Sequence, residues 1–338
     1  MKVLVTGGLG FIGSHTVVEL QKEGYEVLIV DNLENSSRDV LDGITRITGV
    51  KPEFYELDLK YKTAIEVLCA EHPDLAGVIH FAANKAVGES VQHPLKYYKN
   101  NINSLVYLLE ELIKLKNKNF IFSSSCTVYG EADELPITEN AAVKPAESPY
   151  GNTKQIGEEI ISDVCNINND FKAVALRYFN PIGAHPSAEI GELPLGVPQN
   201  LVPFITQTAM GLREKLSVFG GDYPTPDGTC IRDYIHVVDL AKAHVVALER
   251  LLNNQQESNL EVFNLGTGKG SSVLEVIDSF ERVSGEKLRY EITDRRTGDV
   301  VSAYAETSRA KNVLGWETQL SLDDAMASAW KWEQKIRN

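Results

Sequence analysis

Apolar runs alternate with amphipathic stretches along the first half of the chain. Continuous runs of Val, Leu and Ile predict buried strands at residues 3–5 and 27–30, with a helix at 14–23 between them. The same alternation predicts strands at residues 54–57, 78–81, 120–123 and 173–176, and helices at 61–71, 95–115 and 150–166. Continuous apolar strands that alternate with helices are typical of a parallel sheet covered on both faces. The pattern therefore predicts an α/β fold with a doubly wound, Rossmann-type parallel sheet.

The alternation weakens after Arg177. A run of prolines and a glycine-rich stretch at residues 220–228 follow, and further helices are predicted at 238–252, 272–283 and 322–336. With 338 residues, the chain exceeds the size at which a single core usually stops growing. We expect a Rossmann-type domain at residues 1–180 and a smaller α/β domain at 181–338, with later segments crossing the boundary.

A glycine motif lies between the first predicted strand and helix. The spacing of Gly7, Gly10 and Gly13 permits a tight turn in which backbone N–H groups and the helix N-terminus approach a pyrophosphate. An ordinary glycine loop is the alternative, but the position between strand and helix favours dinucleotide binding. Asp31 ends the second strand, where a carboxylate can bind ribose hydroxyls and repel a 2′-phosphate, so NAD is favoured over NADP. Asp58, after the third strand, either contacts the adenine amine or simply begins a helix.

Tyr150 and Lys154 are four residues apart in a predicted helix, so they share one face. A free tyrosine has a pKa of about 10 and is a weak base at neutral pH. A nearby positive charge favours the phenolate, and Lys154 supplies one while also reaching a nicotinamide ribose. Together with the glycine motif, the pair predicts hydride chemistry at a carbon that bears a hydroxyl. Either motif alone is weak, because such pairs often lie on a solvated helix surface.

Hydroxyl side chains follow the predicted strand at residues 120–123. Ser125 and Thr127 lie where the carboxyl ends of parallel strands line a ligand crevice. A hydroxyl there can bond a substrate alcohol and relay its proton, and the sequence does not say which of the two does so. A serine-rich turn without function is the alternative.

Charge and cysteine content exclude several classes. The formal net charge is −14, which disfavours nucleic acid and anionic membranes as partners. Cys69, Cys126, Cys165 and Cys230 are far apart, and the histidines form no ligand pattern, so no metal site or disulfide framework is expected. We expect reduced thiols and a cytoplasmic location. We expect no signal peptide, because the first strand begins at once, and no membrane span.

Longer segments carry a resemblance to a known family. They are residues 80–90, 97–101, 123–130, 176–184, 228–237 and 295–299. With these segments, the glycine turn and the Tyr/Lys pair, the chain resembles the extended short-chain dehydrogenases/reductases and, among them, the UDP-glucose (UDP-galactose) 4-epimerase family. The resemblance runs from Val3 to Trp332. The first two motifs indicate only the superfamily, whereas the later segments are more specific.

The resemblance implies two sets of contacts. Those to NAD are Gly7, Gly10, Phe11, Ile12, Gly13, Asp31, Asn32, Leu33, Glu34, Asn35, Ser36, Asp58, Leu59, Phe81, Ala82, Ala83, Asn84, Lys85, Asn100, Ser125, Tyr150, Lys154 and Phe179. Those to a UDP-sugar are Ser125, Tyr150, Asn180, Asn200, Leu201, Phe219, Arg232, Arg296, Asp299 and Ala303. Arginines suit a diphosphate because their planar heads carry several donors, and Phe219 can stack on uracil. A surface ion pair is the alternative for each arginine.

The resemblance also implies an activity, an assembly and a substrate range. The activity is reversible C4 epimerisation of UDP-glucose and UDP-galactose through a 4-keto sugar, with tightly bound NAD and Tyr150 as base. The assembly is a homodimer through the helices at residues 95–115 and 150–166. At Ala303 some family members carry Tyr. Alanine there leaves space for an N-acetyl group, so UDP-N-acetylhexosamines become possible substrates. A one-residue shift of this loop would put Tyr304 there instead.

Two other functions are weighed against this one. A nucleotide-sugar 4,6-dehydratase begins with the same oxidation but needs adjacent acidic residues beside the catalytic Thr. Here Cys126 precedes Thr127 and Val128 follows it. A non-catalytic NAD-binding protein could keep the glycine turn, but it has no need of Tyr150 and Lys154 together with the two arginines.

Overall fold

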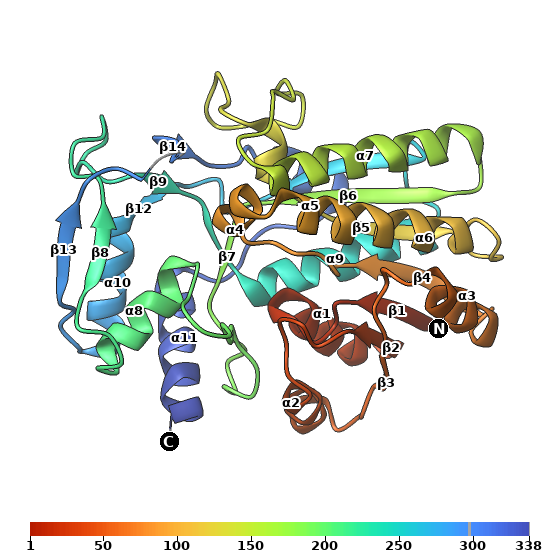
Figure 1. The fold of residues 1–338 in the computed structure, drawn as a ribbon, viewed down its shortest axis with the longest axis horizontal. Helices are drawn as coiled ribbons and strands as arrows, with labels where there is room; N and C mark the ends of the chain where they lie inside the picture. Colours follow the sequence, from red (N-terminus) through yellow and green to blue (C-terminus); the bar gives the residue numbers. More distant parts are fainter. Residues whose placement is uncertain (297–298, 338) are drawn as a thin grey trace.

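A parallel sheet forms the centre of the protein in a computed structural model that describes residues 1–296 and 299–337 (Figure 1). The sheet has seven strands in the order β11-β6-β5-β4-β1-β2-β3. Their bounds are β1 (Lys2–Thr6), β2 (Glu26–Asp31), β3 (Glu53–Glu56), β4 (Leu75–His80), β5 (Asn119–Ser125), β6 (Lys172–Tyr178) and β11 (Leu260–Leu265). All neighbouring pairs in this sheet are parallel. The predicted doubly wound α/β fold is confirmed.

Helices cover both faces of this sheet. They are α1 (Phe11–Lys22), α2 (Asp39–Thr48), α3 (Lys62–Glu71), α4 (Val87–Gln92), α5 (Pro94–Tyr97), α6 (Asn103–Leu112), α7 (Pro149–Ile167) and α9 (Val237–Leu252). Successive side chains of a strand point to opposite faces. Val3 and Val5 therefore join one core with residues of α1 and α9, whereas Leu4 joins a second core with residues of α3, α6 and α7. This two-sided burial explains why the strands are continuously apolar.

A smaller lobe lies beside the carboxyl end of the sheet, at the left of Figure 1. Its strands form short pairs or triplets: β7 (Asn180–Ile182) with β10 (Tyr234–His236), β8 (Leu216–Phe219) with β13 (Tyr290–Thr293), and β9 (Ile231–Arg232) between β12 (Ser271–Ser272) and β14 (Ser302–Ala303). Its helices are α8 (Leu201–Ala209), α10 (Val273–Ser284) and α11 (Leu322–Arg337). Ile182, Val218, Phe280 and Met326 belong to its core.

Two later segments return to the large sheet. Strand β11 pairs with β6 in the register Phe263↔Leu176, and α9 packs against the core that contains Val3 and Val5. A parallel neighbour requires a crossover connection, and here the connection runs through part of the small lobe and returns along α9. The division at residue 180 stays a prediction for whole domains, and α9 and β11 are the segments that cross it.

The helix predicted at residues 95–115 is interrupted. A π-helical turn at Tyr98–Ile102 separates α5 from α6. Such turns often occur at functional sites, because the extra residue redirects a side chain. Other short helices are a 3₁₀ turn at Cys126–Tyr129 and a π-helical turn at Ala310–Leu314. Measured against a bilayer, every helix in the described ranges falls short of a membrane span in length or in apolar content.

Candidate active site

The predicted site residues gather at the carboxyl edge of the parallel sheet. Gly7 follows β1, Asp31 ends β2, Phe81 follows β4, Ser125 ends β5 and Phe179 follows β6. These strands are neighbours, so residues that are far apart in sequence lie along one edge. The connections leave β1 and β4 in opposite directions, which is where open α/β sheets bind ligands.

The turn after β1 has room only for glycine at two positions. Gly7 has φ +68°, and a Cβ there would lie 2.8 Å from the Ala82 nitrogen. A Cβ on Gly13 would lie 2.2 Å from the Gly7 carbonyl oxygen. The Gly10 N–H closes the turn by donating to that same oxygen at 3.1 Å. The turn is therefore a bare backbone cradle at the start of α1, and it fits a dinucleotide pyrophosphate.

Asp31 ties this turn to the loop after β2. Its Oδ2 accepts from the Leu9 N–H at 3.1 Å, and its Oδ1 accepts from the Leu33 N–H at 3.0 Å and the Ser36 hydroxyl at 2.7 Å. The Asn32 amide donates to Asp58 at 3.3 Å, so the residue that follows Asp31 is linked to Asp58. A carboxylate accepts about four hydrogen bonds, so Asp31 retains capacity for a ribose hydroxyl.

An asparagine network links the loop after β4 to α7. The Asn101 amide donates to the Asn84 carbonyl and the Thr153 hydroxyl, both at 3.0 Å, and its oxygen accepts from the Asn84 N–H at 2.8 Å. Thr153 in turn donates to the Tyr150 carbonyl at 2.7 Å. Asn100 donates to the Asn101 oxygen at 3.0 Å. Asn101 was not predicted as a site residue, and its only signal was its place in the 97–101 segment.

The start of α7 presents Tyr150 and Lys154 together. The Ser148 hydroxyl caps the helix by accepting from the Gly151 N–H at 3.1 Å, and Pro149 follows it in the first turn. Lys154 is 4% exposed, and its Nζ donates to the Ser123 carbonyl at 2.5 Å. Burial lowers the pKa of Lys154 to about 8, against the opposing charge of Glu158. Burial raises the pKa of Tyr150 to about 12, against the opposing effect of the neighbouring Ser125 side chain.

Both candidate relay hydroxyls lie next to the start of α7. The Ser125 side chain lies near Tyr150, and its Oγ accepts from the Thr127 N–H at 3.2 Å. The Thr127 hydroxyl is buried, and it has no hydrogen-bond partner within the described ranges. A Cβ placed on Gly151 would lie 3.4 Å from the Thr127 Cβ, so Thr127 lies against the first turn of α7. Both hydroxyls therefore stay candidates for the proton relay.

Five of the residues predicted to bind a UDP-sugar come together in the smaller lobe. Ala303 pairs with Arg232 across β14 and β9. Arg296 donates to Asp299 at 2.8 and 3.1 Å, and an Arg232 nitrogen lies 3.7 Å from the same carboxylate. The Arg296 guanidinium carbon lies 5.6 Å from the centroid of the Phe219 ring. Thr297 and Gly298 of the 295–299 segment lie outside the described residues.

Glu192 connects residues from the two predicted contact sets. Its carboxylate accepts from the Asn200 amide at 2.5 Å and lies 3.7 Å from the Lys85 ammonium. No motif singled out Glu192 in the sequence. Leu201 begins α8 and is partly buried, whereas Glu34 and Asn35 are exposed on the loop after β2. The remaining predicted contacts, Phe11, Ile12, Leu59, Ala82 and Ala83, are wholly or partly buried next to the turns described above.

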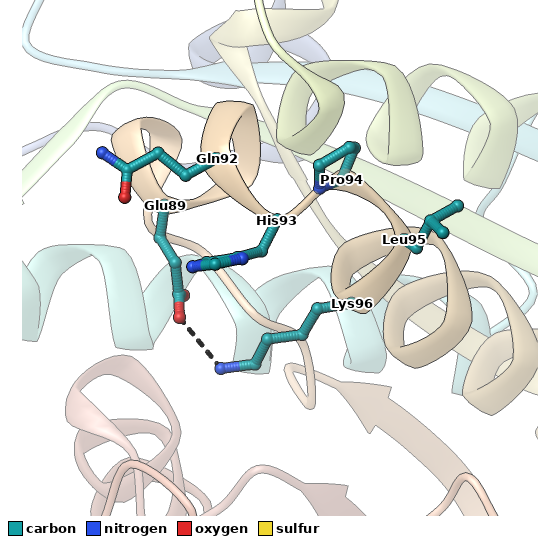
Figure 2. Close-up of a pocket in the computed structure, with 6 residues that line it drawn as sticks. All are labelled: Glu89, Gln92, His93, Pro94, Leu95 and Lys96. Carbon is teal, nitrogen blue, oxygen red and sulfur yellow. Dashed lines mark hydrogen bonds and ion pairs between the residues drawn. The ribbon is translucent and has the colours of Figure 1, made fainter.

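A surface pocket lies on the segment between Lys85 and Asn100. It has a volume of about 630 Å³ and is lined by α4, α5 and the residues between them, namely Glu89, Gln92, His93, Pro94, Leu95 and Lys96 (Figure 2). Glu89 accepts a hydrogen bond from Lys96 at 3.0 Å across it. None of the predicted site residues lines this pocket, but Lys96 also lies 3.2 Å from the predicted NAD contact Glu34, so the pocket borders the site.

Known proteins match the chain along its whole length. A family model described as GDP-mannose 4,6 dehydratase matches residues 4–329. The UDP-glucose 4-epimerase of Bacillus subtilis (strain 168) is 50% identical over 338 residues, which are 100% of this chain and 98% of that protein. The chain belongs to the UDP-glucose 4-epimerase family.

Solved structures of this epimerase family have the same fold. The UDP-glucose-4-epimerase from Stenotrophomonas maltophila, with bound NAD and formylated UDP-arabinopyranose, has a TM-score of 0.96 and 45% identity, covering 100% of this chain and 99% of that one. The enzyme from Bifidobacterium longum, in complex with NAD+ and UDP, has a TM-score of 0.95 and 46% identity, with the same coverage. The large sheet and the smaller lobe are therefore those of a UDP-glucose 4-epimerase family member.

Proposed function

We propose that the protein interconverts UDP-glucose and UDP-galactose by reversible epimerisation at C4. The observation that carries this proposal is the pairing of Tyr150 with the buried Lys154, whose Nζ lies 5.8 Å from the centroid of the Tyr150 ring, at the sheet edge that also bears Ser125 and the glycine turn. The ligands held by the two similar epimerase structures, NAD with a UDP-sugar or with UDP, support the same assignment.

NAD is the proposed cofactor, and the structure offers residues that fit it. The glycine cradle would hold the pyrophosphate, Asp31 a ribose, and Lys154 the nicotinamide ribose. The Asn84 amide is buried without a partner within the described ranges, so it is a further donor for this ligand. When bound, NAD supplies a hydride acceptor and donor, so that C4 is oxidised and reduced again without net redox.

The side chains of the protein perform the remaining tasks. Tyr150 takes the proton of the sugar 4-hydroxyl, directly or through Ser125. It returns the proton after the 4-keto sugar has rotated in the site to present its opposite face. Arg232 and Arg296 bind the diphosphate, and Phe219 stacks on the uracil. Because both arginines already contact Asp299, a diphosphate between them shares or replaces that carboxylate as their partner.

A nucleotide-sugar 4,6-dehydratase is the second candidate, because the matching family model carries that description. Elimination of water requires an acid and a base beside the sugar C5 and C6. The neighbours of Thr127 are a thiol and an isopropyl group, Cys126 and Val128, and burial raises the pKa of the Cys126 thiol to about 12. Neither side chain can donate and accept protons as an acidic pair does, which favours epimerisation.

One incubation separates the candidates. Purified protein is mixed with UDP-galactose, without added cofactor, and the products are resolved by NMR. UDP-glucose is the expected product. A 4-keto-6-deoxy sugar would establish the dehydratase, and unchanged UDP-galactose with NAD recovered from the denatured protein would establish a non-catalytic binder.

The proposal includes a homodimer in the cytoplasm. The pairing helices are α5, α6 and α7, and Leu95 on α5 is 80% exposed, which leaves an apolar side chain available for a partner. All four cysteines are free thiols, as expected in a reducing compartment. Light scattering after size exclusion tests the dimer, since a monomer mass would contradict it.

A further inference from the structure

Asp233 is a fully buried carboxylate that directly follows Arg232. Its exposed fraction is 0%. Its Oδ1 accepts from the Thr267 N–H at 2.8 Å and the Thr267 hydroxyl at 2.7 Å. Its Oδ2 accepts from the Gly268 N–H at 3.2 Å and the Ala305 N–H at 3.1 Å. These four donors fill the acceptor capacity of an ionised carboxylate.

The backbone of Asp233 joins two further strands. Its N–H donates to the Ala303 carbonyl at 3.1 Å, and its carbonyl accepts from the Asn180 N–H at 2.9 Å. Arg232, Ala303 and Asn180 all belong to the proposed UDP-sugar site. One residue therefore connects the three segments that carry them with the loop at residues 266–268.

Gly266 makes room for this carboxylate. A Cβ at Gly266 would lie 2.3 Å from the Asp233 Oδ2 and 2.8 Å from the Ala305 Cβ. The close approach of this loop and the strand end after β14 thus depends on the missing side chain. Because every donor is a fixed backbone group or a hydroxyl of this loop, the carboxylate sets the spacing between the loop and β14.

We propose that Asp233 is a positioning residue that holds Arg232 and Ala303 at the spacing required by a UDP-sugar. The proposal rests on the proposed function, because it concerns the same site. Asp233 touches neither reacting atoms nor cofactor in this role. It acts through Arg232 on one side and through the strand that carries Ala303 on the other.

Asp233→Asn is the first test. In either orientation the new NH₂ group faces at least one fixed backbone N–H, that of Thr267 on one side or those of Gly268 and Ala305 on the other, so one side of the network opens. We expect the KM for UDP-galactose and the Kd for UDP to rise about tenfold or more, because the loss of hydrogen bonds to a charged group propagates to the diphosphate site. We expect kcat to change less than about threefold and NAD content to stay constant, because Tyr150 and the glycine turn lie on other elements.

Asp239→Asn is the matched control. Asp239 is 1% exposed and accepts from the Gln319 and Leu320 N–H groups, both at 2.8 Å. It lies on α9 and contacts none of the proposed substrate residues. The Asp239→Asn variant should have a lower melting temperature, because a buried carboxylate is lost. Its KM and its affinity for UDP should be unchanged.

Thr267→Val decides the matter if Asp233→Asn does not fold. It removes the hydroxyl donor at 2.7 Å from Asp233 and keeps the Thr267 N–H. A rise in KM and in UDP Kd at constant kcat supports positioning. Unchanged UDP affinity in the folded variants, or a parallel loss of UDP affinity, kcat and NAD content, overturns it. UDP titration calorimetry needs no turnover, so wild-type protein that binds UDP without epimerising UDP-galactose would contradict the proposed function alone.

Discussion

The Nζ of Lys154 lies 5.8 Å from the centroid of the Tyr150 ring and is anchored on the Ser123 carbonyl. The anchor holds the ammonium at the end of β5, beside the base but without a direct hydrogen bond to its oxygen. Burial acts on both groups in the same sense, because it favours the neutral form of each. Tyr150 therefore becomes an effective base only where positive charge faces it.

Tyr150→Phe tests the base. General-base loss typically lowers the rate by about 10²–10⁴, and we expect turnover of UDP-galactose to fall by at least that much with NAD still bound. Tyr129→Phe is the control, since it removes another buried phenol, which donates to Asn264 at 2.6 Å. Near-normal turnover by Tyr150→Phe would exclude the proposed role.

Lys154→Met tests the electrostatic role of the ammonium. Lys154 carries its charge below a pKa of about 8, where it favours the Tyr150 phenolate. Without this charge the pKa of Tyr150 rises, so the increase of kcat/KM with pH that reports its ionisation should move to higher pH. In wild-type protein the stabilisation of the Tyr150 phenolate by Lys154 should fade as pH rises above about 8, because the lysine loses its charge. The variant has no such charge to lose. An identical profile in both proteins would mean that Lys154 only holds the ribose.

The same pKa makes a separate prediction for stability. Lys154 has a pKa of about 8 in the folded protein, below the ordinary lysine pKa of 10.5, so between these values the unfolded chain binds more protons. The free energy of unfolding of wild-type protein should therefore rise with pH in this window relative to Lys154→Met, by on the order of 1 kcal/mol per pH unit. Urea unfolding of both proteins at pH 7 and pH 9.5 gives the difference. If the free energy of unfolding of wild-type protein falls relative to that of Lys154→Met as pH rises, burial does not lower the pKa of Lys154.

Much of the fold could be predicted from the sequence, because strands that are buried on both faces are continuously apolar. Val3 and Leu4 are both apolar because they enter different cores, and such runs predict a parallel sheet. The smaller lobe offers no such pattern, because β9 and β14 have two residues each. The adjacency of Arg232 and Ala303 is thus a product of folding, and the family resemblance was what brought both residues into the predicted site.

Other parts of the site have no local signal. The π-helical turn that carries Asn101 lies in a stretch whose apolar pattern predicts an uninterrupted helix. Glu192 lies in an irregular segment and acquires its role only when Lys85 and Asn200 approach it. The buried hydrogen bonds of Asp233 likewise join residues separated by more than thirty positions. Long-range polar contacts of this kind follow from the tertiary structure and not from periodicity.

Arg296→Ala and Arg232→Ala test the diphosphate site. Hydrogen bonds to charged groups contribute about 1.5–3 kcal/mol each, so each variant should weaken UDP binding roughly tenfold to a hundredfold. Arg282→Ala is the control, because this arginine pairs with Asp323 and contacts no proposed substrate residue. Unaltered UDP affinity of both site variants in titration calorimetry would place the diphosphate elsewhere.

Ala303 carries the prediction about substrate range. It packs against the cluster that contains Tyr129 and Phe179, next to the turn that bears Ser125 and Thr127. The neighbouring Tyr304 instead directs its ring toward Gly270, where a Cβ would lie 3.2 Å from the ring. The prediction takes the ungapped count, in which the small side chain of Ala303 leaves space for a bulky C2 substituent.

We therefore expect the wild-type protein to interconvert UDP-N-acetylglucosamine and UDP-N-acetylgalactosamine as well as the hexoses. Ala303→Tyr should abolish the N-acetylhexosamine reaction and spare UDP-galactose, because the added ring fills space without touching Tyr150. Tyr304→Ala should leave both reactions in place, since its ring lies against Gly270. Product formation from UDP-N-acetylgalactosamine, followed by NMR, decides the matter. If wild-type protein yields no product while it turns over UDP-galactose normally, the space beside Ala303 does not receive the C2 substituent.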